Sequence, residues 1–112
     1  MTLRRPESLA DQDFNETAWA TMNVLLVLLE HGGVLSTAEV ASRAEIGRDA
    51  ARRLLRTLAA AEWARRVQVE GAESWSLGPE LPRIGVQWQE LLVSRMRSLR
   101  ADFDRVASPA TR

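Results

Sequence analysis

Four arginines fall within a nine-residue stretch near the middle of the chain. They are Arg48, Arg52, Arg53 and Arg56. At about 100° per residue, a helix over residues 48–61 turns these side chains outward together with Asp49. A guanidinium group donates paired hydrogen bonds to a guanine edge or a phosphate, and a helix fits the major groove of DNA. The chemistry that this pattern offers is therefore nucleic-acid recognition.

The opposite side of the same helix is apolar. Its members share one broad face at helical spacing, and they are Ala50, Ala51, Leu54, Leu55, Leu58 and Ala61. We expect this face to join the core. Trp63 and Trp75 are expected to pack in the core and a hairpin, because large aromatic side chains bury more area there than as platforms for bases.

A shorter helix precedes the arginine-bearing one. Ser36 and Glu39 have the spacing of a capping box, which marks a helix start. Residues 44–47 break the pattern, and we expect Gly47 to adopt a positive φ there. Two helices joined by so short a turn predict a helix-turn-helix. Because helix N-termini can bind phosphate, Ser36 and Thr37 join the predicted DNA contacts.

Two alternating segments follow, over residues 65–69 and 74–77. They predict a β-hairpin, or wing, attached to the helix-turn-helix. Residues 70–73 would form its tip, which is acidic and therefore unsuited to grip phosphate. Arg65 and Arg66 at the base of the wing are the better candidates for DNA contact.

From His31 to Pro79 the chain resembles the winged helix-turn-helix domain of the IclR family of bacterial transcription regulators. The matching pieces are EHGG, LST-AEVA, IGR, RRLLRTL, AAAEW and SWSLGPEL. The resemblance implies DNA binding and a bacterial origin. The chain departs from the family at Asp49 and Ala50, where small hydroxyl residues are usual, and at Trp75, where Tyr is usual. Family members also carry a large C-terminal effector-binding domain, where only a few tens of residues follow here.

Composition excludes several kinds of site. The chain of 112 residues has no cysteine and one histidine, so disulfides, thiolate metal sites and histidine clusters are excluded. We find no nucleophile motif or phosphate-cradling glycine loop, and we predict no enzyme activity, no cofactor and no metal. No membrane-length apolar run or signal peptide is visible, which predicts a cytoplasmic protein without a membrane partner.

Net charge is zero, but it is unevenly distributed. Residues 1–42 hold two arginines and six acidic residues, a net charge of −4. Residues 43–66 hold seven arginines and three acidic residues, a net charge of +4. The positive charge is thus concentrated on the proposed reading element, where local density decides attraction to phosphate.

Two further helices are predicted, from Phe14 to Glu30 and from Leu81 or Pro82 to Val106. The first is apolar on almost all sides, and from Leu92 the second has apolar steps of 4, 3, 4 and 3 residues, a short heptad seam. Such an excess of apolar surface predicts a homodimer. The predicted interface residues are Trp19, Val24, Leu28, Trp88, Leu92, Met96, Leu99 and Phe103.

The predicted fold is mainly α with a small β-hairpin: a winged helix-turn-helix with an additional long C-terminal helix. Residues 1–13 would form a flexible N-terminal arm and residues 14–79 the winged domain. Residues 80–107 would form the dimerisation helix and residues 108–112 a disordered tail.

We therefore predict a transcriptional regulator that reads operator DNA through helix 48–61 as a homodimer. A two-fold dimer implies an inverted-repeat operator, and no small-molecule effector is evident. The alternative is a winged-helix module for protein contact, of a bacterial phage or accessory protein, that does not bind DNA; Asp49 and the acidic wing tip favour it.

Overall fold

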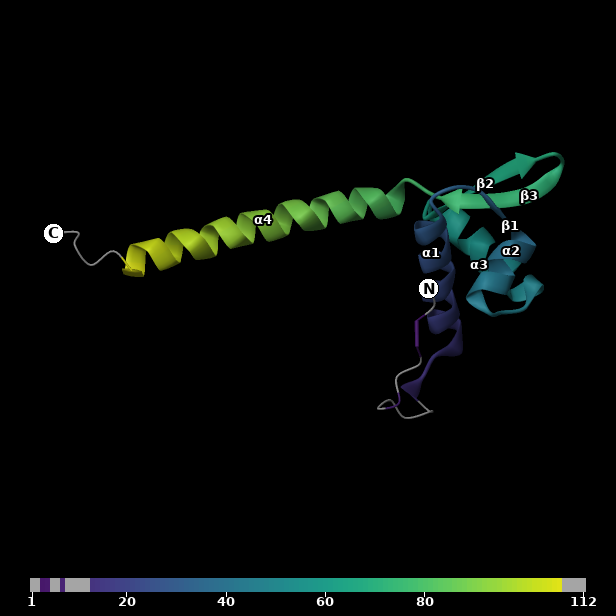
Figure 1. Cartoon of the computed structure of the whole chain (residues 1–112), viewed down its shortest axis with the longest axis horizontal. Coiled ribbons are helices and arrows are strands. Elements are labelled where there is room, and N and C mark those ends of the chain that lie inside the picture. The colour runs from purple at the N-terminus through teal and green to yellow at the C-terminus, as the bar shows by residue number, and fades with distance from the viewer. Residues whose placement is uncertain (1–2, 5–6, 8–12, 108–112) are drawn as a thin grey trace. The chain divides into compact units, whose positions relative to one another are not determined.

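The computed structural model describes residues 3–4, 7 and 13–107. The chain divides into two compact units, Met1–Glu80 and Leu81–Arg112. The elements along the chain are α1 (Glu16–His31), β1 (Leu35–Ser36), α2 (Thr37–Ala44), α3 (Arg48–Ala60), β2 (Ala64–Val69), β3 (Ala72–Leu77) and α4 (Glu80–Ala107) (Figure 1). The predicted fold class, a winged helix-turn-helix with a long C-terminal helix, is confirmed. The predicted tail at 108–112 and most of the predicted arm at 1–13 lie outside the described residues.

Helix α2 begins with the capping box that the sequence predicts. The Ser36 side chain accepts from the Glu39 N–H at 3.1 Å, and Glu39 Oε1 accepts from the Ser36 N–H at 3.2 Å. The turn that follows differs from the prediction. Glu45 takes the left-handed conformation (φ 58°), whereas Gly47 is extended (φ −68°) and caps α3. The left-handed residue must directly follow the last helical residue, and that position belongs to Glu45.

The three strands form one antiparallel sheet in the order β1-β3-β2. The hairpin closes at the pair Val69 and Ala72, so its loop contains only Glu70 and Gly71. Both loop residues have positive φ, 49° and 79°, as a two-residue hairpin turn of type I′ requires. The predicted four-residue acidic tip is therefore wrong, because Glu73 belongs to strand β3.

The core of the first unit lies between the helices and the sheet. Trp75 on β3 is completely buried, and its indole N–H donates to the Thr37 hydroxyl at 2.8 Å. Trp63 is partly buried against the same cluster, so the prediction of packing roles for both tryptophans is confirmed. The prediction for Ala61 is wrong, since this residue is exposed at the C-terminal cap of α3.

Helix α1 buries its apolar stripe within the first unit. It contacts α2, α3 and β3, and Val24 and Leu28 have no exposed surface. Their predicted place in a dimer interface is therefore wrong, because the neighbouring elements already cover them. Trp19 is partly buried, with its ring 5.4 Å from that of Phe14.

Gly78 fixes the point at which β3 ends. Its N–H donates to the Trp63 carbonyl at 2.9 Å. A Cβ at this position would lie 2.3 Å from the Glu62 carbonyl oxygen, closer than atoms can approach without backbone movement. The close packing of the backbone at the end of β3 against residues 62–64 therefore requires glycine at position 78.

The second unit consists of most of helix α4. This helix has 28 residues, and none of those described is buried. Large apolar side chains are exposed along it, among them Trp88, Met96, Leu99 and Phe103 at 58%, 67%, 61% and 70%. Like the rest of the described chain, it is not long and apolar enough to cross a membrane.

Candidate nucleic-acid interface

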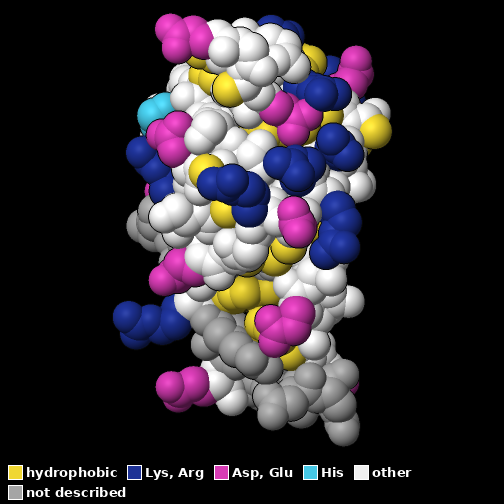
Figure 2. Space-filling model, turned by 90° about the vertical axis from the view of Figure 1, so that its right-hand side faces the viewer, with side chains coloured by type: hydrophobic (Ala, Val, Ile, Leu, Met, Phe, Trp, Pro, Cys, Tyr) yellow, Lys and Arg dark blue, Asp and Glu magenta, His cyan; other side chains and the backbone are white. Residues whose placement is uncertain are grey.

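The outward face of α3 and the wing form one charged surface. Figure 2 shows arginine side chains gathered across this side of the molecule, with acidic side chains among them. The surface is therefore not uniformly cationic. Its character depends on which arginines are paired with carboxylates and which are not.

One carboxylate holds arginines from both the helix and the wing. Glu73 Oε1 lies 3.5 Å from Nε of Arg52, and Glu73 Oε2 lies 2.7 Å from Nη2 of Arg66. Arg56 Nη2 lies 4.0 Å from the same Oε2. The Glu73 side chain is only 17% exposed, which reduces screening of these ion pairs by water. We call Glu73, Arg52, Arg56 and Arg66 the arginine clamp.

The strand register explains how the clamp assembles. Arg66 pairs with Trp75 and Gln68 pairs with Glu73 across the hairpin, so these side chains share one face. Because side chains alternate along a strand, Arg65 lies on the other face. The two wing arginines predicted to act together therefore point to opposite sides of the sheet.

Asp49 makes a second, weaker contact with the same group of arginines. Its carboxylate lies 3.8 Å from Nη1 of Arg52, and its side chain is 92% exposed. Arg52 thus faces two carboxylates, on different nitrogens of its guanidinium group. Much of its positive charge is balanced within the protein.

The remaining predicted arginines are not balanced in this way. Arg48, Arg53 and Arg65 are exposed and form no ion pair with any residue that the structure describes. Arg53 lines a surface pocket together with Glu16, Thr17 and Ala20 of α1. The surface therefore has two classes of arginine, clamped and unclamped.

The two residues predicted at the start of α2 have different surroundings. Thr37 is buried, and its hydroxyl accepts from the Trp75 indole, so its side chain belongs to the core and its predicted contact with DNA stays a prediction for the start of α2. Ser36 is partly exposed and caps the helix. Its hydrogen bonds hold the pKa of the Glu39 carboxyl below its usual value of 4.5, with smaller contributions from Arg43 and His31.

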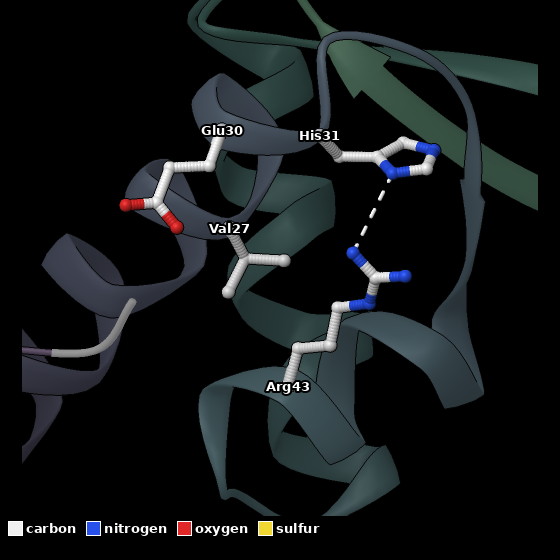
Figure 3. Close-up of a pocket in the computed structure, with 4 residues that line it drawn as sticks. All are labelled: Val27, Glu30, His31 and Arg43. Carbon is white, nitrogen blue, oxygen red and sulfur yellow. Dashed lines mark hydrogen bonds between the residues drawn. The ribbon is translucent and has the colours of Figure 1, made fainter.

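A surface pocket of about 500 Å³ lies beside the C-terminal end of α1 (Figure 3). It is lined by Val27, Glu30, His31 and Arg43, and the Arg43 guanidinium lies 3.5 Å from Nδ1 of His31. Among residues 3–4, 7 and 13–107, no group of three or more His, Asp or Glu side chains could hold a metal ion. The pocket thus places the Arg43 guanidinium beside the His31 imidazole, with Glu30 in the same lining.

Sequence reasoning missed the role of Glu73. The signal was present, because Glu73 precedes Trp75 by two residues and so shares the face of a residue that was expected to be buried. Placing Glu73 in the loop rather than the strand hid this relation.

Comparison with known proteins rests on structure. No protein-family model matches the chain, and no curated protein matches it by sequence. HmgR of Pseudomonas aeruginosa is similar in structure, with a TM-score of 0.59 and 25% identity over 68% of this chain. An IclR family transcriptional regulator from Brucella abortus aligns with 83% of the chain at a TM-score of 0.67 and 19% identity. A MarR family transcriptional regulator from Silicibacter pomeroyi aligns with 83% of the chain at a TM-score of 0.50 and 14% identity.

The matched part is a minority of the two larger proteins. The chain covers 32% of HmgR and 35% of the Brucella regulator, and 58% of the Silicibacter one. These comparisons establish that the chain has the winged-helix fold found in transcriptional regulators of two families.

Proposed function

We propose that the protein is a DNA-binding transcriptional regulator of IclR-like type that reads operator DNA through α3 as a homodimer. The observation that carries the proposal is the exposed, arginine-bearing face of α3 beside the wing. In a winged helix this is the element able to enter a major groove, while the wing runs along the adjacent backbone. The fold supports this use, and so does the resemblance of residues 31–79 to the IclR domain.

The unclamped arginines supply the first contacts in this proposal. Arg48 and Arg53 are exposed on α3 and lack carboxylate partners among the described residues, so phosphate or guanine can bind them without first displacing a protein group. Arg65 extends from the other face of the wing. In this proposal Ser36 at the start of α2, Asp49 and the clamped arginines adjust this contact.

A second copy of the chain is the proposed partner of α4. Its apolar residues are spaced as a short heptad seam, and Leu92, Met96, Leu99 and Phe103 are 40%, 67%, 61% and 70% exposed. Monomeric proteins rarely expose so much contiguous apolar surface. The seam is apolar throughout, so the same seam on a second copy is a matching partner, and Trp88 extends it toward the start of α4.

Titration of DNA binding against salt tests the DNA-reading function. We expect the affinity for duplex DNA to fall steeply with salt, with a logarithmic slope of roughly −0.9 for each phosphate contacted. Arg48→Gln with Arg53→Gln should weaken binding and flatten the slope by about two contacts. Arg95→Gln with Arg97→Gln removes equal charge from α4 in place of α3 and serves as the control. Salt-independent binding, or equal effects of both pairs, would overturn the proposal.

The alternative function is protein contact through the same surface. Glu73 and Asp49 favour it, because both place carboxylates beside the arginines that would have to attract phosphate. A protein partner with mixed charge would tolerate this arrangement. In that case the affinity for DNA would be weak and equal for all sequences, while a protein partner would bind with little dependence on salt.

A further inference from the structure

We propose that Glu73 is a positioning residue of the DNA interface, which holds the arginines of α3 and of the wing in one arrangement and so raises discrimination between DNA sequences. This inference rests on the proposed DNA-reading function. It assigns to an acidic side chain a favourable role in binding an acidic ligand.

The geometry makes Glu73 a bridge between two elements. One carboxylate oxygen faces Arg52 of α3 at 3.5 Å, and the other faces Arg66 of β2 at 2.7 Å. Arg56 stands at 4.0 Å on the second oxygen, one helical turn along from Arg52. A carboxylate has enough acceptor positions for several guanidinium donors, so all three arginines can be held together.

Burial makes this bridge more than a surface ion pair. The Glu73 side chain is 17% exposed, whereas the three arginines are 40%, 59% and 53% exposed. The carboxylate is therefore more buried than the guanidinium groups that it holds, and the arginines keep exposed surface for a ligand. Arginines fixed in this way lose less side-chain entropy when they bind, which favours ligands that match the fixed geometry.

Charge gives Glu73 a second effect. Three arginines without a carboxylate would attract any phosphate backbone strongly and without regard to sequence. With Glu73 in place, part of that charge is balanced, and non-specific attraction is reduced. Discrimination between DNA sequences depends on the difference between their affinities. When the attraction that is common to all sequences is weakened, contacts that differ between sequences make up a larger share of the binding, and discrimination increases.

Glu70 provides a matched control within the same hairpin. It is an exposed glutamate at the wing tip, three residues before Glu73, and forms no ion pair with the described residues. Glu70→Gln and Glu73→Gln thus change net charge equally in nearly the same place. Only Glu73→Gln breaks the clamp.

The experiment measures binding to two DNA probes. One is a 30-base-pair random-sequence duplex, and the other is a duplex enriched by the wild-type protein from a random library. We expect Glu73→Gln to raise affinity for the random duplex and to reduce the ratio of the two affinities by about tenfold. Glu70→Gln should change both affinities alike and leave the ratio within about twofold. Equal ratios for the two variants would overturn the proposal.

Side-chain NMR of the arginines, without DNA, tests the clamp separately. Glu73→Gln should shift the Nε–H signal of Arg52 and the guanidinium signals of Arg66, and Glu70→Gln should leave them in place. Unshifted signals would overturn the clamp even in a protein that binds DNA. If the wild-type protein enriches no sequence while the signals do shift, the DNA-reading function is what fails, and the role of Glu73 in reading falls with it.

Discussion

Helices α1 and α4 are both rich in large apolar residues, yet the surroundings of these residues differ completely. In α1 the stripe that contains Val24 and Leu28 is buried by α2, α3 and β3. In α4 no described residue is buried, although Trp88, Leu99 and Phe103 are large and apolar. An apolar helix pattern therefore predicts a face that must be buried. It does not predict whether the same chain or a partner buries that face.

The difference also separates stability that comes from contacts within one chain from stability that comes from contacts with a second copy. The first unit contains a closed core, capped helices and a paired sheet. For α4 we infer stability through a second copy. Paired substitutions, one in each region, can test this division, because chemically identical changes should have different consequences.

The largest difference is expected between two tryptophans. Trp75→Ala should destabilise the first unit by about 3–5 kcal/mol, since it opens a cavity and leaves the Thr37 hydroxyl without its donor. Trp88→Ala removes the same side chain from an exposed position and should change the free energy of unfolding of the first unit by no more than about 0.5 kcal/mol. Chemical denaturation at a protein concentration below the dimer dissociation constant checks both. Similar losses in the two variants would contradict the assignment of Trp88 to an intermolecular surface.

Two glycines should respond with opposite signs. Gly78→Ala brings a Cβ against the Glu62 carbonyl and should cost about 1–3 kcal/mol. At Gly85, within α4, a Cβ meets nothing within 4 Å, and alanine is the better helix former, so Gly85→Ala should stabilise α4 by about 0.5–1 kcal/mol. Denaturation midpoints for the first variant and helical circular dichroism for the second measure these effects. A stable Gly78→Ala protein would mean that the end of the wing can move.

The capping box should give a smaller effect in the first unit. Ser36→Ala removes the acceptor for the Glu39 N–H and should destabilise α2 by about 1 kcal/mol. Thermal unfolding at neutral pH measures this loss. Normal stability together with weakened DNA binding would indicate instead that the Ser36 hydroxyl contacts phosphate.

The smallest effect is a dependence on pH through Glu39. The folded state lowers the pKa of this carboxyl, so its contribution to stability is present above the unfolded pKa and is lost as pH falls through the folded value. The wild type should therefore lose stability on acidification below about pH 4.5 more steeply than Glu39→Gln. Unfolding curves between pH 3 and 6 (about the range of carboxyl titration) compare them. Parallel curves would exclude a contribution from Glu39.

Local features of the fold were predictable from the sequence because their causes are local. Asn15, Ser36 and Gly32 cap their helices as their side-chain chemistry or positive φ requires, and the observed helix bounds follow. The left-handed conformation of Glu45 was not predicted. Glycine adopts this conformation most easily, but that preference does not say which residue of the turn must adopt it. The geometry of the turn decided it.

The candidate site was predictable only in part. The outward direction of Arg48, Arg53 and Arg56 follows from helical periodicity alone. The clamp depends instead on the hairpin loop having two residues, which moves Glu73 into β3 and onto the face of Trp75. Which side chains meet between different elements depends on the register of the strands, and the local sequence pattern does not determine that register.

Dimerisation can be tested at the seam itself. Leu99→Glu places a charge in the centre of the proposed α4 interface and should convert the dimer to a folded monomer, whose affinity for a two-site duplex falls by about 100-fold or more. Arg100→Glu, at the next residue, also introduces a glutamate and serves as the control. Light scattering at micromolar concentration measures the mass. A monomeric wild type would contradict the proposed role of α4.

Hydroxyl-radical footprinting on a duplex enriched from a random library tests the central claim, a DNA-reading homodimer, most directly. We predict two protected half-sites related by inversion, with centres about 34 Å apart or a multiple of that distance. Leu99→Glu should lose the paired pattern, and Arg48→Gln with Arg53→Gln should weaken both halves equally. A single uninverted protected site, or no enrichment of any sequence by the wild-type protein, would contradict the account.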